Sequence, residues 1–406
     1  MKKRILFYYD NYCGSSSKGG TEVATFRIAS ALVASGECEV FNAFMRKNPE
    51  KPDNVYKGIL KLRNFKKSFV ESLGDFIRRN EIDVVVNMGR FFRHDKLKDS
   101  IERSGRDVKL IFMHHFAPGS ESKKIKPSAA LHLLKLNPLN ALYWLRFFFY
   151  PLVKLPRRLS MPKAYRNVHE KSDAIVLLSP SYLDQYRKIA GLDKDSSKFF
   201  AIPNIFPPRV SDGDSLQNKE KNVLILSRMD EIQKRISLSL QVWKKIEERG
   251  DLDNWKLDIV GSGHDIKAIK KLAKSLKLKN VVFHGWQNGF EFLKKSSILM
   301  STSDYEGLSL SMIEAQSLGC VPVAFNSYSS LQDIVEDGVN GVCVSPYPDT
   351  EAFANRLANV MLDASARENM MLNGLNSSSR FSPEKIAGLW LSLLSSLEPP
   401  RHHNNY

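Results

Sequence analysis

The sequence predicts an α/β protein with two domains, each built on a parallel sheet covered by helices. The 406 residues are about twice the length of a usual domain. Short apolar runs alternate with amphipathic segments along nearly the whole chain, a pattern typical of successive βαβ units. A stretch rich in Pro, Asp, Ser and Gly at 206–220 interrupts this alternation and is the expected linker.

Each expected domain, 1–205 and 221–380, contains six apolar runs that predict buried strands. The strands of the first domain are RILFYY, ECEVFNAF, DVVVNM, KLIFMH, AIVLLS and KFFAIP. Those of the second domain are NVLILS, KLDIVG, VVFHG, ILMST, VPVAF and GVCVS. Amphipathic segments such as TEVATFRIASALVASG and HDIKAIKKLAKSLKL lie between them and predict helices. Both domains are therefore expected to be Rossmann-like, with a cleft between them.

The composition is that of a globular protein with an excess of positive charge. Hydrophobic residues make up 43% and charged residues 26%, enough apolar material for two cores, and this excludes a disordered chain. The 60 Lys and Arg exceed the 44 Asp and Glu and give a net charge of +16. Partners that carry negative charge are favoured: nucleotides, phospholipid head groups or nucleic acid.

The cysteines and the N-terminus predict a reducing compartment. Cys13, Cys38, Cys320 and Cys343 form no CxxC pair and no metal-ligand spacing, and each falls in or beside an apolar run. We expect reduced thiols that pack as small hydrophobes. The first apolar run ends at Asp10 and is too short for a signal peptide. These features predict a cytoplasmic protein.

One segment, 121–166, departs from the alternation of strands and helices. It contains ten Lys or Arg against the single acid Glu121, so it supplies +9 of the net charge, and leucines and aromatic residues are interleaved with the bases. Its charges and prolines exclude a spanning helix, whereas the pattern is typical of a helix in an anionic membrane interface. The alternative is a helical insertion packed on its own domain. Since over half of the excess charge lies in this lipid-like segment, nucleic-acid binding is not expected.

Two carboxylates in the segment DYEGLSLSMIEAQSLGCVPVAF, Glu306 and Glu314, are eight residues apart. If a helix starts near Leu308 or Ser309, its free N–H groups and positive dipole end suit a phosphate or sugar hydroxyls. Glu314 could then accept hydrogen bonds from a vicinal diol, and Glu306 could reach a sugar ring. The alternative is a buried amphipathic helix that carries two acids without a role.

The same segment resembles the E-x7-E motif of retaining glycosyltransferases of family 4, which have the GT-B fold. LSRMDEIQKRISLSL, IVEDGVNGVCV and AIPNIF also resemble segments of that family, and KLDIVGSGHD and NVVFHGW resemble its two central strands. Their order and spacing agree from about residue 200 to 345, while the match over KGGTEVATFRIASAL and the two histidines after KLIFM is looser. The resemblance implies two Rossmann-like domains that face each other across a cleft, with a C-terminal helix, 381–398, that returns to the first domain.

The resemblance also implies roles for residues of the second domain. Arg228 and Lys234 correspond to the pair that contacts the donor diphosphate in the family, where fixed cations stabilise the leaving group in place of a metal. Glu306 would position the sugar and Glu314 would anchor the ribose. Three further residues at the expected helix start would line the same site: Gly307, Leu308 and Ser309.

The resemblance also implies that a histidine at the end of the strand KLIFMHH borders the donor sugar. His115 fits this place better by its position after the strand, and His114 is the second choice. Ligands of open α/β sheets bind at this edge. The alternative is a histidine satisfied by neighbouring backbone.

Two glycine pairs follow strands and could allow a ligand to approach the backbone. Gly19 and Gly20 would lie near the diphosphate or the acceptor, and the resemblance implies that Gly261 and Gly263 lie near the nucleotide base. A tight turn without a ligand is an equal alternative for the second pair. Neither a Walker A motif nor GxGxxG is present around the first pair, so a dinucleotide cofactor is not expected.

Together these features predict a hexosyltransferase that moves a hexose, with retention, from a UDP- or GDP-sugar to a hydroxyl of a glycan or lipid-linked acceptor. Cell-surface polysaccharide or lipopolysaccharide synthesis is the expected setting, at the inner face of the plasma membrane. Neither a metal nor a further cofactor is expected. The alternatives are a sugar-nucleotide epimerase or phosphorylase of the same fold, or a catalytically silent protein that binds a membrane surface.

Overall fold

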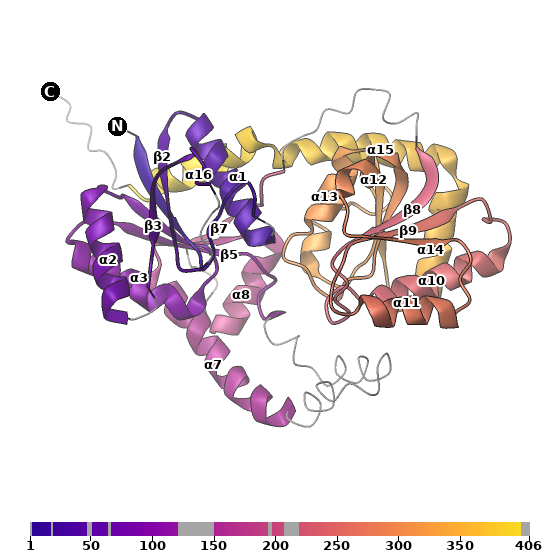
Figure 1. The fold of residues 1–406 in the computed structure, drawn as a ribbon, viewed down its shortest axis with the longest axis horizontal. Coiled ribbons are helices and arrows are strands. Elements are labelled where there is room, and N and C mark those ends of the chain that lie inside the picture. The colour runs from indigo at the N-terminus through magenta and orange to yellow at the C-terminus, as the bar shows by residue number, and fades with distance from the viewer. Residues whose placement is uncertain are drawn as a thin grey trace. The chain divides into compact units, whose positions relative to one another are not determined.

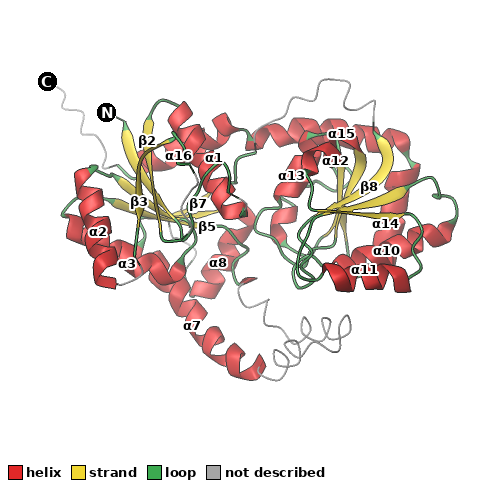
Figure 2. Ribbon diagram, viewed as in Figure 1, coloured by secondary structure: helices red, strands yellow, loops and turns green. Residues whose placement is uncertain are grey.

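The chain forms two compact units in the computed structural model, which describes residues 2–17, 19–46, 51–63, 66–120, 150–193, 197–206 and 219–398. Unit 1 comprises Met1–Pro118, Leu159–Pro207 and Phe381–Tyr406, and unit 2 includes Pro208–Arg380 (Figure 1). Each unit contains a sheet with helices packed on it (Figure 2).

Unit 1 has a seven-stranded sheet in the order β3-β2-β1-β4-β5-β6-β7, and every pair of neighbours is parallel. Its strands are β1 (Lys3–Tyr8), β2 (Cys38–Phe44), β3 (Tyr56–Lys61), β4 (Val84–Asn87), β5 (Lys109–His114), β6 (Ala174–Leu177) and β7 (Phe199–Ala201). The six predicted strands are confirmed. The sequence analysis missed β3, an edge strand whose YKGILK sequence is mostly half-exposed and therefore lacks a buried apolar run.

The helices of unit 1 include the last one of the chain. They are α1 (Gly20–Ala34), α2 (Lys66–Arg79), α3 (His94–Ser104), α7 (Tyr150–Lys171), α8 (Leu183–Ala190) and α16 (Pro383–Ser396), with the short turns η1 (Phe91–Arg93) and η2 (Pro180–Tyr182). Helix α16 packs against α1, and its buried Trp390 meets Phe7 of β1 edge-on at 6.5 Å. The predicted return of the C-terminal helix to the first domain is confirmed.

Unit 2 has a six-stranded parallel sheet in the order β10-β9-β8-β11-β12-β13. Its strands are β8 (Glu220–Leu226), β9 (Lys256–Val260), β10 (Val281–Gly285), β11 (Ser296–Ser301), β12 (Val321–Phe325) and β13 (Val342–Val344). All six match the predicted apolar runs. The expectation that VVFHG forms a central strand is wrong, because β10 lies at an edge of the sheet and leaves Val282 exposed.

The helices of unit 2 cover a continuous apolar core. They are α10 (Ile236–Arg249), α11 (Ile266–Ser275), α12 (Gly289–Lys295), α13 (Leu310–Ser317), α14 (Thr350–Leu362) and α15 (Ala364–Ser378), with the short turns η3 (Ser329–Leu331) and η4 (Ser379–Phe381). Trp243 of α10 is fully buried in the same cluster as Leu257 of β9 and Phe325 of β12. This packing holds rigid the strand ends from which the site loops emerge.

The four thiols pack as the sequence predicts. Cys13, Cys38 and Cys320 are buried, Cys343 is half-buried, and all four are free. Burial raises the pKa of the Cys320 thiol to about 12, so this thiol is protonated at neutral pH and acts as a small apolar group.

The predicted membrane segment, 121–166, falls largely outside the described residues, as does most of the linker, 206–220. Within the described ranges no helix is both long and apolar enough to cross a bilayer. Arg166, one of the ten bases of the segment, donates through Nε to the carbonyl of Ala190 at 3.1 Å and through Nη2 to that of Gly191 at 3.3 Å. This base therefore stabilises the end of α8.

Candidate active site

The candidate site lies at the carboxyl edge of the unit 2 sheet, where the strand order reverses. Strands β8 and β11 are neighbours, yet the chain continues from β8 to β9 on one side and from β11 to β12 on the other. Ligands of open α/β sheets bind in the crevice at such a reversal. The two loops that leave these strands, 227–235 and 302–309, carry Arg228, Lys234 and Glu306.

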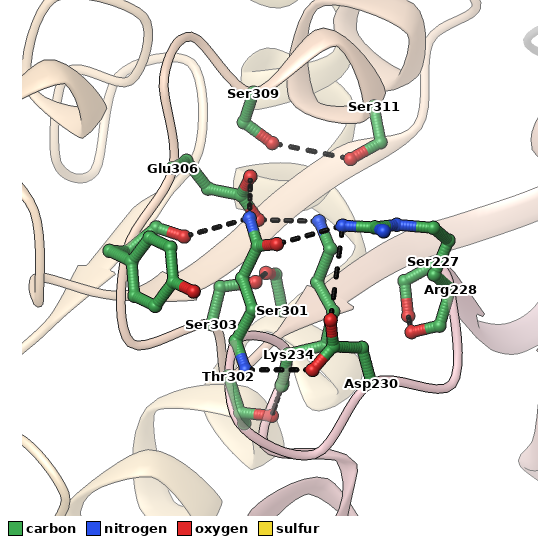
Figure 3. A network of polar contacts seen from close by, with 12 residues as sticks. Ser227, Arg228, Asp230, Lys234, Ser301, Thr302, Ser303, Glu306, Ser309 and Ser311 are labelled. Carbon is green, nitrogen blue, oxygen red and sulfur yellow. Dashed lines mark hydrogen bonds and ion pairs between the residues drawn. The ribbon is translucent and has the colours of Figure 1, made fainter. Parts of the chain in front are cut away.

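A shielded ion pair joins the two loops. Lys234 Nζ lies 2.5 Å from Glu306 Oε1, and the two side chains are only 16% and 9% exposed (Figure 3). The other carboxylate oxygen, Oε2, accepts a hydrogen bond of 3.1 Å from Nε2 of Gln233. Because both oxygens are engaged, the carboxylate of Glu306 has a fixed orientation. Lys234, and not the adjacent Arg235, is thus the base that points to the predicted carboxylate.

Arg228 lies beside this pair and is open to solvent. Its Nη2 donates to Gln233 Oε1 at 2.9 Å and lies 4.0 Å from Asp230 Oδ2, and 68% of its side chain is exposed (Figure 3). Asp230 Oδ1 accepts the backbone N–H groups of Ile232 and Gln233 at 3.2 and 3.3 Å, which fixes the turn. An ordered loop therefore holds the exposed guanidinium of Arg228.

Helix α13 starts at the predicted place. Its first residue is Leu310, and the N-cap residue is Ser309, whose side chain makes no capping hydrogen bond. The hydroxyl of Ser309 instead lies 3.2 Å from that of Ser311 (Figure 3). The N-cap side chain thus does not cover the N–H groups at the start of the helix. Anion binding at this end requires uncovered N–H groups.

The remaining predicted residues of this segment differ in their surroundings. Leu308 is buried, and the carbonyl of Gly307 accepts a hydrogen bond of 2.9 Å from the Ser330 hydroxyl, so both residues anchor the loop before α13. Glu314 lies in the second turn of α13 and is half-buried. The structure thus brings Glu306 to Lys234 and places Glu314 on α13.

Gly261 and Gly263 allow the turn after β9 to pack directly on the loop that carries Arg228. A Cβ on Gly261, whose φ is +139°, would lie 1.8 Å from the carbonyl oxygen of Ser227, and one on Gly263 would lie 2.4 Å from that of Met229. The backbone N–H of Met229 donates to the carbonyl of Ser262 at 3.0 Å. Close approach of two backbone segments thus explains both glycines without a ligand.

The glycine pair of unit 1 lies at the start of α1. Gly19 is the N-cap residue and Gly20 the first helical residue. A Cβ on Gly19 would meet the carboxylate of Glu22 at 2.0 Å, whereas one on Gly20 would meet no atom within 4 Å. The carboxylate is held by Asn11, whose Nδ2 donates to Glu22 Oε1 at 2.7 Å. Gly19 therefore makes room for a neighbouring side chain.

The two histidines at the end of β5 have different surroundings. His114 stacks on Phe112 at 6.0 Å and meets Tyr165 and Tyr186 edge-on, so it is part of an aromatic core. His115 is buried beyond the strand end, and its Nε2 has no hydrogen-bond partner among the described residues. Burial and the neighbouring His114 lower the pKa of His115 to about 3. Its imidazole is therefore neutral at physiological pH.

The depressed pKa of His115 predicts a loss of stability in acid. The unfolded chain takes up the proton near pH 6.5 and the folded chain only near pH 3. The free energy of unfolding is therefore not reduced by this group above pH 6.5, and it falls as the pH drops below 6.5. At pH 5 the loss from this group is roughly 2 kcal/mol. Urea unfolding between pH 7 and pH 4 should show a shallower pH dependence for His115→Gln. Equal pH dependences would contradict the prediction.

One group among the described residues has the donor types of a metal site: Asp230, His264 and Asp265, whose ligand atoms lie within 4.8 Å of one another. Asp265 Oδ2 accepts the backbone N–H of Glu231 at 2.8 Å and lies 3.1 Å from His264 Nε2. Since both carboxylates accept backbone N–H groups, the loop conformation explains their proximity. Asp230 Oδ2 also lies 4.0 Å from Arg228 Nη2, so added metal ions are a necessary control in binding experiments.

Sequence reasoning missed one residue of the site, Gln233. Its amide contacts both Arg228 and Glu306, which lie 78 positions apart in the chain. Only its place directly before Lys234 could have indicated Gln233 in the sequence, because a glutamine on a loop forms no motif of its own. Only the pairing of the two loops reveals it.

Comparison with known proteins identifies the class of unit 2. Residues 210–376 match the family described as Glycosyl transferases group 1, and they include both site loops. This match assigns residues 210–376, and not the whole chain, to that family. The match does not extend to unit 1.

Two curated relatives support this assignment. The poly(glycerol-phosphate) alpha-glucosyltransferase of Bacillus subtilis is 28% identical over 231 residues, which cover 55% of this chain and 33% of the relative. The amylovoran biosynthesis glycosyltransferase AmsD of Erwinia amylovora is 27% identical over 184 residues, which cover 45% of this chain and 50% of the relative. The chain thus matches from a third to a half of the length of these relatives.

A solved structure shares the fold over nearly the whole chain. Anabaena Alr3699/HepE, in complex with UDP and glucose, superposes on this chain with a TM-score of 0.71 and 15% sequence identity. The superposition covers 97% of this chain and 100% of the Anabaena chain. This likeness confirms the predicted GT-B fold, with two Rossmann-like α/β units.

Proposed function

We propose that this protein is a retaining glycosyltransferase that moves a hexose from a UDP- or GDP-sugar to a hydroxyl of a glycan or lipid-linked acceptor. The observation that carries the proposal is the cluster of Arg228, Lys234 and Glu306 at the strand-order reversal of the group 1 domain. Two cations and a fixed carboxylate beside a helix N-terminus suit a diphosphate that is attached to a sugar.

The two cations supply the charge stabilisation that the reaction needs. As the bond from the anomeric carbon to the diphosphate breaks, negative charge grows on the leaving phosphate. Arg228 and Lys234 would neutralise this charge, and α13 adds the positive end of its dipole. Glu306, whose orientation is fixed by two hydrogen-bonding partners, would position the sugar. Glu314 would hold the ribose from the second turn of the helix.

In this proposal the anomeric configuration is retained because the acceptor hydroxyl attacks the anomeric carbon on the face from which the leaving group departs. The leaving phosphate accepts the proton of the acceptor hydroxyl, the new bond from that oxygen to the anomeric carbon forms, and the nucleoside diphosphate departs. Fixed cations keep the phosphate next to the anomeric carbon while it takes the proton. His115, which is neutral at physiological pH, would act as a hydrogen-bonding group without charge.

The relatives support the choice of donor and setting. The Anabaena structure contains UDP and glucose, the Bacillus relative is named as a glucosyltransferase, and the Erwinia relative is named for amylovoran biosynthesis. On this basis we propose that the chain acts in cell-surface polysaccharide or lipopolysaccharide synthesis.

A lipid-linked acceptor at the inner membrane face is supported by exposed aromatic groups on unit 1. Phe92, in the turn after β4, is 91% exposed between Arg90 and Arg93, and Phe116 is exposed just beyond the end of β5. Strands β4 and β5 are neighbours, so both rings follow the same edge of the sheet. Aromatic rings beside arginines suit an anionic membrane surface, and the basic and aromatic composition of 121–166 is typical of segments that bind such a surface.

Thermal stability in the presence of nucleoside diphosphates tests the donor site. A ligand at 100 times its dissociation constant should stabilise the wild-type chain by about 2.7 kcal/mol. We expect this for UDP or for GDP, unchanged by EDTA or by added Mn²⁺, and lost in Glu314→Ala. Glu368→Ala, which removes an exposed carboxylate of α15, is the matched control and should respond as the wild type does.

Two results would contradict the proposal. Stabilisation by no nucleotide would exclude a nucleotide-sugar transferase and would favour a membrane-binding protein. Stabilisation that EDTA abolishes would show that a metal ion, and not Arg228 and Lys234 alone, holds the diphosphate.

A further inference from the structure

We propose that Gln233 is a positioning residue that fixes the side chains of Arg228 and Glu306 relative to each other. It thereby links the part of the donor site that would bind the diphosphate to the part that would bind the sugar. The proposal rests on the transferase function argued above. It adds a residue that neither the motif nor the spacing of charged groups indicates.

Both the oxygen and the nitrogen of the Gln233 side-chain amide form hydrogen bonds. Its Oε1 accepts from Arg228 Nη2 at 2.9 Å, and its Nε2 donates to Glu306 Oε2 at 3.1 Å and to the carbonyl of Tyr305 at 3.2 Å. A guanidinium can only donate and a carboxylate can only accept, so a group that joins them must do both. A primary amide does so from one rigid plane.

The backbone of Gln233 is fixed by the same two loops. Its N–H donates to Asp230 Oδ1 at 3.3 Å, and its carbonyl accepts the backbone N–H of Asp304 at 2.8 Å. The residue as a whole is only 7% exposed. With its main chain and its amide both held, Gln233 links the loop after β8 to the loop after β11.

This link sets the geometry of the two groups that would contact the donor. Lys234 engages one carboxylate oxygen of Glu306 and Gln233 engages the other, while the acidic neighbour of Arg228, Asp230, is 4.0 Å away. Displacements of about 1 Å in a positioning group can lower a rate by roughly a hundredfold. Loss of the amide should therefore affect the chemical step more than the charge that binds the diphosphate.

The first test replaces the amide with a group that donates only in acid, Gln233→Glu. When protonated, the new carboxyl can donate to Glu306 as the amide does. When ionised, it places a second carboxylate about 3 Å from the first, which opposes ionisation of both. The charged or titratable groups that face this position are Arg228, Asp230, Lys234, Asp304, Tyr305 and Glu306.

The pH profile of transfer should therefore change in a defined direction. Gln233→Glu should approach the wild-type kcat/KM near pH 5.5 and fall at least about tenfold below it by pH 8, because deprotonation removes the donor and adds repulsion. A residue that only supports the fold would shift both ends of the profile equally.

A second variant, Gln233→Met, removes both hydrogen bonds at every pH and keeps the length of the side chain. It should lower kcat about tenfold or more while the dissociation constant of the nucleoside diphosphate changes less than about threefold, since Arg228 and Lys234 keep their charges. Asn340→Asp is the matched control, because it changes another buried amide of unit 2, bonded to Ile334 and Ser377, in the same chemical way. It should leave the pH profile unchanged.

The outcomes separate the two proposals. A wild-type chain that transfers no sugar overturns the transferase function and this role together. A wild-type chain that transfers sugar, with Gln233→Glu following its pH profile and Gln233→Met keeping its kcat, overturns the role of Gln233 alone.

Discussion

Lys234→Met should lower the rate of sugar transfer by about a hundredfold or more and should also destabilise unit 2. A fixed cation beside a leaving diphosphate contributes about 100- to 1,000-fold to the rate. In the same variant Glu306, only 9% exposed, loses its cation, and removing one partner of such a shielded pair costs about 3–5 kcal/mol. Transfer assays and urea unfolding measure the two effects separately.

The double variant Lys234→Met/Glu306→Gln distinguishes the two effects. With both charges removed, much of the stability should return, whereas transfer should stay low. Lys244→Met is the matched control, since its exposed i,i+4 pair with Glu248 should contribute less than about 0.5 kcal/mol. A double variant as unstable as the single one would show that the ion pair does not set the stability of the site.

Gly261→Ala is expected to have the second large effect. The new Cβ would lie 1.8 Å from the carbonyl oxygen of Ser227, at a φ of +139°, so the turn after β9 and the loop that carries Arg228 must separate. Backbone strain and overpacking each cost about 1–3 kcal/mol, and we expect a total loss of about 3–5 kcal/mol with weaker nucleotide binding.

The control for this substitution is Gly250→Ala. Gly250 has a φ of +74° but no atom within 4 Å of an added Cβ, so only the cost of the left-handed conformation applies, about 1–2 kcal/mol. Thermal unfolding and nucleotide titration of both variants give the comparison. If Gly261→Ala matches Gly250→Ala in both measurements, the close packing of the two segments does not maintain the site.

The sheets could be predicted from the sequence because their strands are buried on both faces and read as short apolar runs. Strand β3 was missed because it is an edge strand with Lys57 and Lys61 among its six residues. The placement of β10 at an edge could not be predicted, since the order of strands in a sheet is set by tertiary packing and leaves no local pattern.

The charged members of the site could be predicted, and their contacts could not. The E-x7-E segment led to Glu306, and the resemblance to the family led to Lys234, but the sequence does not show that these two side chains form an ion pair. Gln233 was missed because its contacts join loops about 70 positions apart. The glycines after β9 left two alternatives open, ligand approach or a tight turn without a ligand, and the structure shows that they allow two backbone segments to meet.

The measurement that most directly tests the central claim is release of nucleoside diphosphate from nucleotide sugars, with glycans and membrane lipids as acceptors. The account predicts acceptor-dependent release from a UDP- or GDP-hexose by the wild-type chain, unchanged by EDTA, with the anomeric configuration of the donor kept in the product. Lys234→Met should reduce this release about a hundredfold or more. Release that is unaffected by Lys234→Met, or a product of inverted configuration, would contradict the account.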